Sequence, residues 1–117
     1  MIKSTILTYA HEHYNSIPEH PFKSSPTTAV LRHQTNRKWY GVFMTLSKRT
    51  LGIDSDERMD LILIKLQPDL VAILRAKTGY FPAYHMNKEH WISITLDGTV
   101  PAKEICSLLD DSYLLTK

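Results

Sequence analysis

The chain has 117 residues, a formal charge of +2 at pH 7, and 43% hydrophobic and 22% charged residues. These values are typical of a globular protein with one sizeable core, so a single domain over residues 1–117 is expected. No apolar run approaches the ~20 residues of a membrane span, and the N-terminus lacks the apolar stretch of a signal peptide. The one cysteine, Cys106, excludes an internal disulfide and favours a reducing, cytoplasmic setting.

The first element is predicted to be a helix, because apolar residues recur at three- and four-residue steps from Ile2 to Ile17. Pro18 ends this pattern, and the proline-rich residues 20–28 are expected to form a loop.

The remaining elements follow from strand-like apolar runs and from apolar stripes that begin at a proline. Strands are predicted over residues 29–34, 38–46, 61–66 and 91–96, and helices are predicted from Pro68 to Gly79 and from Pro101 to Tyr113. The order is helix, three strands, helix, one or two strands, helix. It predicts the α+β class: a two-layer α/β sandwich with an antiparallel sheet and the helices on one face.

Alternation along the strands assigns side chains to two faces. The set expected to face the helices is Tyr40, Val42, Met44, Leu46, Ile62, Ile64, Leu66, Ile92, Ile94 and Leu96. The set expected on the open face is Trp39, Gly41, Phe43, Thr45, Leu61, Leu63, Lys65, Trp91, Ser93 and Thr95. This open face is too apolar for a merely solvated surface. A dimer interface or covering loop, nucleic-acid stacking and a small-molecule pocket all remain possible explanations.

The charge distribution is uneven. Residues 20–53 contain six Lys or Arg and no Asp or Glu, whereas the segment from Lys103 onward is mildly acidic. The asymmetry favours an anionic ligand on the basic side, although an ordinary solvated face would have the same pattern.

Catalytic and metal sites lack support in the sequence. His11 and His13 are two residues apart on a predicted helix and point to different sides, so they are poorly placed to share a metal ion. Cys106 lies near the apolar stripe of the last helix, as an inert buried thiol would. The sequence contains no phosphate-binding glycine loop and no serine nucleophile motif. We therefore expect no enzyme activity, no cofactor and no metal.

The run from Tyr80 to Trp91 concentrates aromatic, histidine and cationic side chains. If it is extended, Lys88 and His90 lie on one side and can contact phosphates together. The structural alternative is that Asn87 shapes a turn and Trp91 packs across the sheet.

Residues 84–91, Tyr-His-Met-Asn-Lys-Glu-His-Trp, resemble the signature of the MmcQ/YjbR family. Further elements of that family are matched in order along nearly the whole chain, at residues 20–22, 38–43, 63–68, 96–101 and 111–115. The resemblance implies an α-β(3)-α-β(2)-α domain, similar in topology to type III secretion chaperones. It also implies DNA binding, the usual label of a largely uncharacterised family, and it carries over no catalytic residue.

The functional hypothesis is a small non-enzymatic protein that binds DNA weakly through the phosphate backbone. The residues expected to bind are Arg37, Lys38, Lys65 and Lys88 at phosphates, with Trp39, His90 and Trp91 stacking or packing nearby. The signature residues Tyr84, His85, Met86 and Asn87 are expected to have structural roles. The main alternative is a protein-interaction or chaperone-like adaptor, or a homodimer, that uses the apolar open face. A small-ligand or enzymatic pocket around Tyr84, His85, Asn87 and His90 is the third.

Overall fold

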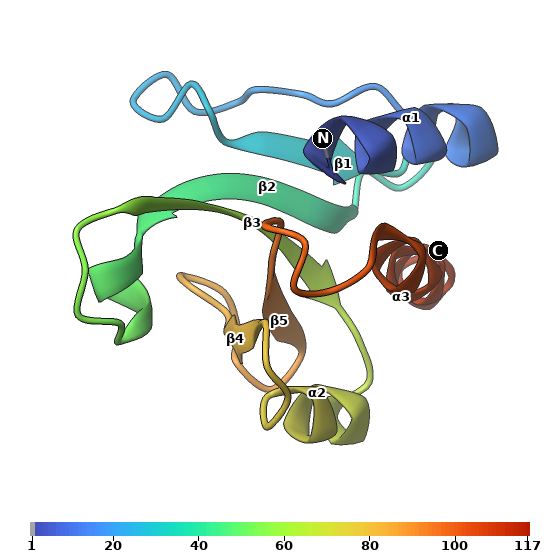
Figure 1. Ribbon diagram of the computed structural model, residues 1–117. Helices are drawn as coiled ribbons and strands as arrows, with labels where there is room; N and C mark the ends of the chain where they lie inside the picture. Colours follow the sequence, from blue (N-terminus) through green and yellow to red (C-terminus); the bar gives the residue numbers. More distant parts are fainter. Residues whose placement is uncertain (1) are drawn as a thin grey trace.

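The computed structural model describes residues 2–117 and has three α-helices around one sheet (Figure 1). The elements are α1 (Ile2–Tyr14), β1 (Ala29–Arg32), β2 (Trp39–Ser47), the 3₁₀-helix η1 (Lys48–Leu51), β3 (Arg58–Lys65), α2 (Pro68–Leu74), β4 (Tyr80–Pro82), β5 (Trp91–Thr95) and α3 (Ala102–Leu115). The predicted order α-β(3)-α-β(2)-α is confirmed.

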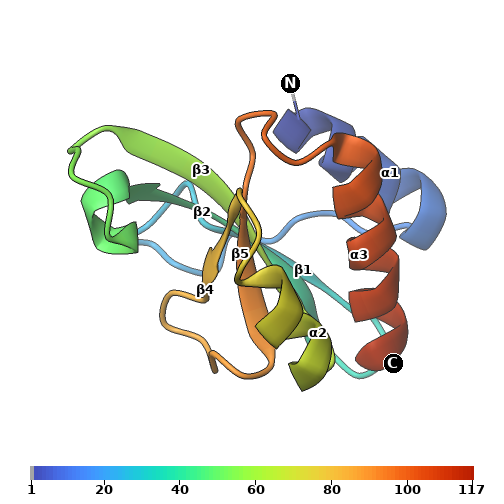
Figure 2. The ribbon, with the colours of Figure 1, turned by 60° about the horizontal axis from the view of Figure 1, so that its bottom comes forward.

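The five strands form one antiparallel sheet in the order β1-β2-β3-β5-β4. Helices α1 and α3 contact each other on one side of this sheet (Figures 1 and 2). The first helix is shorter than predicted, because Asn15 adopts a left-handed backbone with φ of 54° and ends it before Ile17. Strand β3 begins three residues earlier than predicted, since Arg58 still pairs with Ser47.

The core on the helix side is formed by large apolar residues of the helices and of the strands that face them. Its buried members include Ile6, Leu31, Tyr40, Phe43, Ile62, Ile64, Leu66, Ile92, Ile94, Ile105 and Leu109. The face predictions for β3 and β5 are therefore correct, whereas that for β2 is wrong beyond its second residue.

A β-bulge explains the error in β2. Leu31 pairs with Gly41 and Arg32 pairs with Trp39, so Tyr40 is an extra residue in the ladder. An extra residue shifts the alternation by one position. Phe43 therefore packs under the helices with Tyr40, and the predicted helix-facing residues Val42, Met44 and Leu46 lie on the other face.

Helix α3 holds this bulge through Ser112. Its hydroxyl donates a hydrogen bond to the Tyr40 carbonyl at 2.7 Å and accepts one from the Lys65 amide at 3.2 Å. The side chain thus connects β2 to β3 where their own ladder stops. Gly41 allows this close approach, because a Cβ there would lie 3.2 Å from a Leu109 methyl.

The face opposite the helices is not open. A second buried cluster covers it, made of Val30, Val42, Met59, Leu61, Leu63, Ala83 and Trp91. Partly buried residues from η1, the segment after it and the β4–β5 connection pack against this cluster. Figure 2 shows these segments on the side of the sheet away from α1 and α3. Of the three explanations left open by the sequence, a covering loop accounts for most of this face.

Candidate functional site

Most of the predicted binding residues lie at one end of the sheet. Arg32 at the end of β1 pairs with Trp39 at the start of β2, and Lys65 at the end of β3 pairs with Trp91 at the start of β5. Because neighbouring strands are antiparallel, these strand termini lie at the same end of the sheet. We call this region the basic sheet end and define it by Arg37, Lys38, Lys65, Lys88 and His90.

The turn between β1 and β2 is fixed by Asn36 at this end. Its side-chain oxygen accepts a hydrogen bond from the Lys38 amide at 2.9 Å, and its amide group donates to the Thr116 carbonyl at 3.0 Å. Arg37 has φ of 62°, which the tight turn requires. The turn is therefore anchored to the residues that follow α3, and the position of Lys38 is set from both sides.

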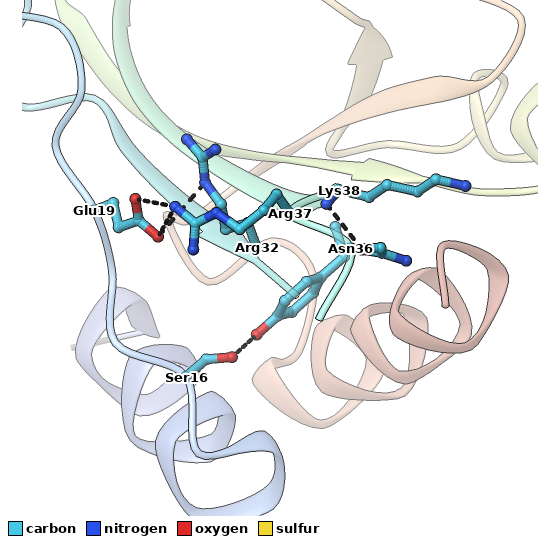
Figure 3. Close-up of polar contacts among 7 residues, drawn as sticks. Ser16, Glu19, Arg32, Asn36, Arg37 and Lys38 are labelled. Atoms are coloured by element: carbon cyan, nitrogen blue, oxygen red, sulfur yellow. Dashed lines mark hydrogen bonds and ion pairs between the residues drawn. The ribbon is translucent and has the colours of Figure 1, made fainter. Parts of the chain in front are cut away.

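Arg37 is not a free cation. Glu19 lies 3.1 Å from its guanidinium and also 3.5 Å from that of Arg32 (Figure 3). Glu19 is held there by reciprocal backbone hydrogen bonds with Val30 at the edge of the sheet. Its carboxylate reduces the positive charge available from both arginines.

The same pairing occurs at the far end of the basic segment. Glu57 lies 3.9 Å from Lys48, and Asp54 and Asp56 lie 3.1 Å and 2.8 Å from Arg49. The acid-free character of residues 20–53 thus disappears in the fold, because acids from outside the segment pair with four of its six cations.

Three lysines of the basic sheet end differ from these arginines. Among residues 2–117, no carboxylate lies within ion-pair distance of Lys38, Lys65 or Lys88. Lys38 and Lys88 are exposed and Lys65 is half-buried. Their charges remain available at the rim of the sheet.

The segment before β5 is a turn and not an extended strand. The Asn87 side chain accepts hydrogen bonds from the amides of Glu89 at 2.9 Å and His90 at 3.3 Å, and its carbonyl accepts one from Trp91 at 2.9 Å. The extended interpretation of Lys88 and His90 is therefore wrong, and the alternative in which Asn87 shapes a turn is correct.

Trp91 is the main correction among the site residues. Only 7% of its surface is exposed, because it packs in the second cluster beside Leu63 and Ala83. A buried indole cannot stack on a visiting base, so Trp91 is a packing residue. His90 is half-buried, and its carbonyl accepts a hydrogen bond from the Leu66 amide at 2.9 Å, which joins the turn to β3.

Trp39, in contrast, borders a hollow that we call the aromatic groove. The groove has a volume of about 370 Å³ and lies between residues 22–28, strand β2 and residues 84–86. Its lining residues are Phe22, Ser24, Ser25, Thr28, Trp39, Val42, Met44, Thr45, Leu46, Tyr84, His85 and Met86. None of them is acidic.

Ring contacts shape both walls of the aromatic groove. Phe22 meets Trp39 edge to face with ring centres 6.1 Å apart, and the Arg32 guanidinium lies 5.7 Å from the Trp39 ring. On the other wall the rings of Tyr84 and His85 are 3.9 Å apart. The signature residues Tyr84, His85 and Met86 thus line a cavity, and Asn87 outside it fixes the turn.

The sequence did not predict the groove residues Phe22, Met44 and Leu46. Simple alternation, which did not include the bulge, assigned Met44 and Leu46 to the helix-facing side, and Phe22 had only the family resemblance of residues 20–22 as a signal. The proposed cluster of Tyr84, His85, Asn87 and His90 is also not formed as one pocket, since only Tyr84 and His85 line the groove.

His33 is a buried ionisable group next to the basic sheet end, where its amide donates a hydrogen bond to the Lys38 carbonyl at 2.9 Å. It is 4% exposed, and its Nε2 lies 2.8 Å from the Thr116 hydroxyl. Burial lowers the pKa of the His33 imidazole, and the charges of Lys117 and Lys38 lower it further, whereas a backbone hydrogen bond at Tyr113 opposes the shift. The neutral ring therefore fits this position.

Neither the cysteine nor the metal-binding residue types form a recognisable chemical site. Cys106 is buried, and burial raises the pKa of its thiol, as expected for an inert cysteine. Across residues 2–117, no group of three His, Cys, Asp or Glu side chains is placed to hold a metal ion. No helix in the same range combines the length and apolarity needed to cross a bilayer.

These features define a small α+β domain with three helices against a five-stranded antiparallel sheet, a cationic sheet end and an adjacent aromatic groove. A family model described as YjbR matches residues 6–115. The chain belongs to the YjbR family.

Relatives agree with this assignment. The uncharacterised protein YyaQ of Bacillus subtilis strain 168 is 38% identical over 117 residues, which is 100% of this chain and 99% of YyaQ. The uncharacterised protein YjbR of Escherichia coli K12 is 36% identical over 58 residues, or 49% of each chain.

Solved structures confirm the fold. A crystal structure of a structural genomics target from Pseudomonas syringae has a TM-score of 0.95 at 47% identity and covers 100% of both chains. Deinococcus radiodurans protein DR2400, described as a DUF419 domain, has a TM-score of 0.73 at 28% identity and covers 97% of this chain and 76% of DR2400.

Proposed function

We propose that this YjbR-family protein is a non-catalytic nucleic-acid-binding protein that contacts the phosphate backbone of DNA through its basic sheet end. The observation that carries the proposal is the convergence of Lys38, Lys65 and Lys88 from three separate chain segments, with no carboxylate partner among the described residues. Unpaired lysines are point charges suited to phosphate oxygens.

The remaining predicted residues have unequal parts in this proposal. His90 lies at the same rim and adds a donor, whereas Arg37 must share its guanidinium with Glu19. Trp39 is half-buried and next to Lys38, so an exposed part of its ring can meet sugar or base atoms. Contacts of this kind fix orientation on the backbone and carry little sequence information.

The number of lysines sets the expected strength. Three phosphate contacts give a slope of about −2.7 for log K against log salt on duplex DNA, since each contact contributes ~0.9. Between 50 and 200 mM salt, affinity then falls about 40-fold. Such binding is weak at physiological salt.

The test is a salt titration of DNA binding by fluorescence anisotropy, with Lys38→Glu, Lys65→Glu and Lys88→Glu beside the wild type. Each substitution should weaken binding several-fold and reduce the salt slope by about 1. Lys103→Glu is the matched control, because Lys103 is an exposed residue in the first turn of α3, away from the basic sheet end, and has no carboxylate within ion-pair distance in residues 2–117. The proposal is rejected if Lys103→Glu and Lys65→Glu lose equal DNA affinity, or if the DNA affinity does not depend on salt concentration.

A protein-interaction role is the second candidate, on a surface different from the one first expected. The face opposite the helices is covered, but Ile73 of α2 is 63% exposed and Leu114 of α3 is 64% exposed. Leu66, Leu70 and Leu114 line a shallow hollow between these helices. Light scattering tests this role: a dimer that Ile73→Ser and Leu114→Ser dissociate supports it, and a monomer at high concentration argues against self-association there.

A further inference from the structure

We propose that the aromatic groove accepts one unpaired nucleobase of a single-stranded nucleic acid whose phosphates lie along the basic sheet end. This inference rests on the proposed function and adds a preference for single strands over duplexes. It assigns a role to the signature residues Tyr84, His85 and Met86, which backbone binding alone leaves unexplained.

The dimensions and lining of the groove suit a base. A volume of about 370 Å³ lies at the small end of known ligand sites, which run from roughly 300 to 1,000 Å³. Bases bind to proteins by stacking on aromatic planes, and Phe22, Trp39 and Tyr84 present rings from three separate segments. The flexible side chains of Met44 and Met86 can adjust their conformations to a planar base.

Polar groups at the groove match the edges of a base. Ser24, Ser25 and Thr28 line one wall, with the hydroxyl oxygens of Ser25 and Thr28 2.6 Å apart, and His85 is exposed on the other wall. These groups can donate to and accept from the edge of any base. The absence of Asp and Glu from the lining avoids repulsion of the phosphates that a bound base brings with it.

The groove adjoins two of the three unpaired lysines along the chain. Trp39 on one wall follows Lys38 in the chain, and Met86 on the other wall precedes Lys88 by two residues. Both walls therefore continue into the basic sheet end. A strand whose backbone crosses the lysines can turn one base into the groove without leaving them.

A duplex has to unpair and unstack a base before it can use the groove. That step has a free-energy cost, which a single strand, whose bases are already unpaired, avoids. We therefore expect single-stranded DNA to bind more tightly than duplex DNA of the same length, although the duplex carries more charge.

The experiment compares three oligonucleotides in 50 mM salt: a twelve-residue oligothymidylate, an abasic strand with the same number of phosphates, and a twelve-base-pair duplex. Oligothymidylate should bind at least about fivefold more tightly than the abasic strand, as one stacked base predicts. Carbon-13-labelled methionine methyls give an independent readout. Signals of Met44 and Met86 should shift with oligothymidylate and not with the abasic strand, whereas Met59, buried outside the groove, should not move.

Phe22→Ser is the diagnostic variant, because Phe22 is 39% exposed and its loss should not unfold the protein. It should lower oligothymidylate affinity to that of the abasic strand and leave abasic binding unchanged. Ile17→Ser, an apolar-to-serine change at a residue that is 70% exposed and does not line the groove, is the matched control and should change neither. If thermal unfolding shows that Phe22→Ser is damaged, Met44→Gln gives the same comparison.

The outcomes separate the two proposals. Equal, salt-dependent binding of oligothymidylate and abasic strand overturns the base site and leaves backbone binding intact. No binding of any oligonucleotide at low salt overturns both. Both proposals are supported if oligothymidylate shifts the Met44 and Met86 signals, the abasic strand does not, and Lys88→Glu weakens oligothymidylate binding.

Discussion

The two faces of the sheet are both buried, but they are buried by different kinds of structure. Helices α1, α2 and α3 cover one face with regular elements that satisfy their own backbone hydrogen bonds. Loops, a short 3₁₀-helix and the signature segment cover the other. Both sides have surface hollows, but the hollow between α2 and α3 has no aromatic residue in its lining, whereas the groove of about 370 Å³ on the loop-covered face is lined by aromatic rings.

This difference indicates where stability and where binding reside. Loop-covered surfaces open and adapt more readily than helix-covered ones, and binding residues concentrate on loops held by a rigid scaffold. The helix-side core therefore serves as the scaffold, and the loop side presents the candidate site.

The largest expected effect compares neighbours on the two faces. Phe43→Ala removes a fully buried ring from the helix side and should cost about 3–5 kcal/mol of unfolding free energy. Met44→Ala, the next residue along β2, removes a half-buried side chain from the loop side and should cost about 1–2 kcal/mol. Urea unfolding measures both, and equal losses would show that the two faces are equally important for stability.

A smaller effect is expected at the connection between helix and bulge. Ser112→Ala leaves the Tyr40 carbonyl and the Lys65 amide without their partner and should cost about 2–4 kcal/mol. Ser107→Ala, at an exposed position of the same helix, is the control and should be nearly neutral. Because Lys65 ends β3 at the basic sheet end, Ser112→Ala should also speed hydrogen exchange there. Unchanged exchange at the Lys65 amide would contradict this role.

The smallest effect depends on pH. The pKa of His33 in the folded protein is lower than 6.5, its value in an unfolded chain, because the ring is buried. Between those two values the unfolded chain binds more protons, so stability is fully present above pH 6.5 and is lost as the pH falls through the window below it. The groups around the ring are Tyr40, Tyr113, Thr116, Lys38 and Lys117.

His33→Gln should therefore flatten the loss of thermal stability between pH 7 and pH 5. His11→Gln, an exposed position on α1, is the control and should keep the wild-type profile. Wild-type pH dependence in His33→Gln would mean that another group is responsible.

Sequence patterns predicted the elements well because local signals determine them. Prolines at 68 and 101 and the three- to four-residue apolar repeats mark the helices, and simple alternation placed Ile62, Ile64, Ile92 and Ile94 under them. The signature segment also identified the family.

The errors arose where distant residues decide the structure. The bulge at Tyr40 depends on Gly41 and on Ser112 of a later helix, so the local pattern around Phe43 gave no indication of it. The charge pattern was misleading for the same reason, because Glu19 lies just outside the acid-free segment and folds back onto Arg37. Burial of Trp91 likewise depends on residues distant in sequence, such as Leu51 and Ile53, whose polar surroundings in the chain gave no indication of a covering segment.

The Ser112 connection also has a consequence for protein synthesis. Its partners at Tyr40 and Lys65 precede it by 72 and 47 residues. On the ribosome, β2 and β3 therefore emerge long before the hydroxyl that closes the gap between them. A nascent chain halted before α3 can pair β2 with β3, but it leaves the Tyr40 carbonyl and the Lys65 amide without this partner.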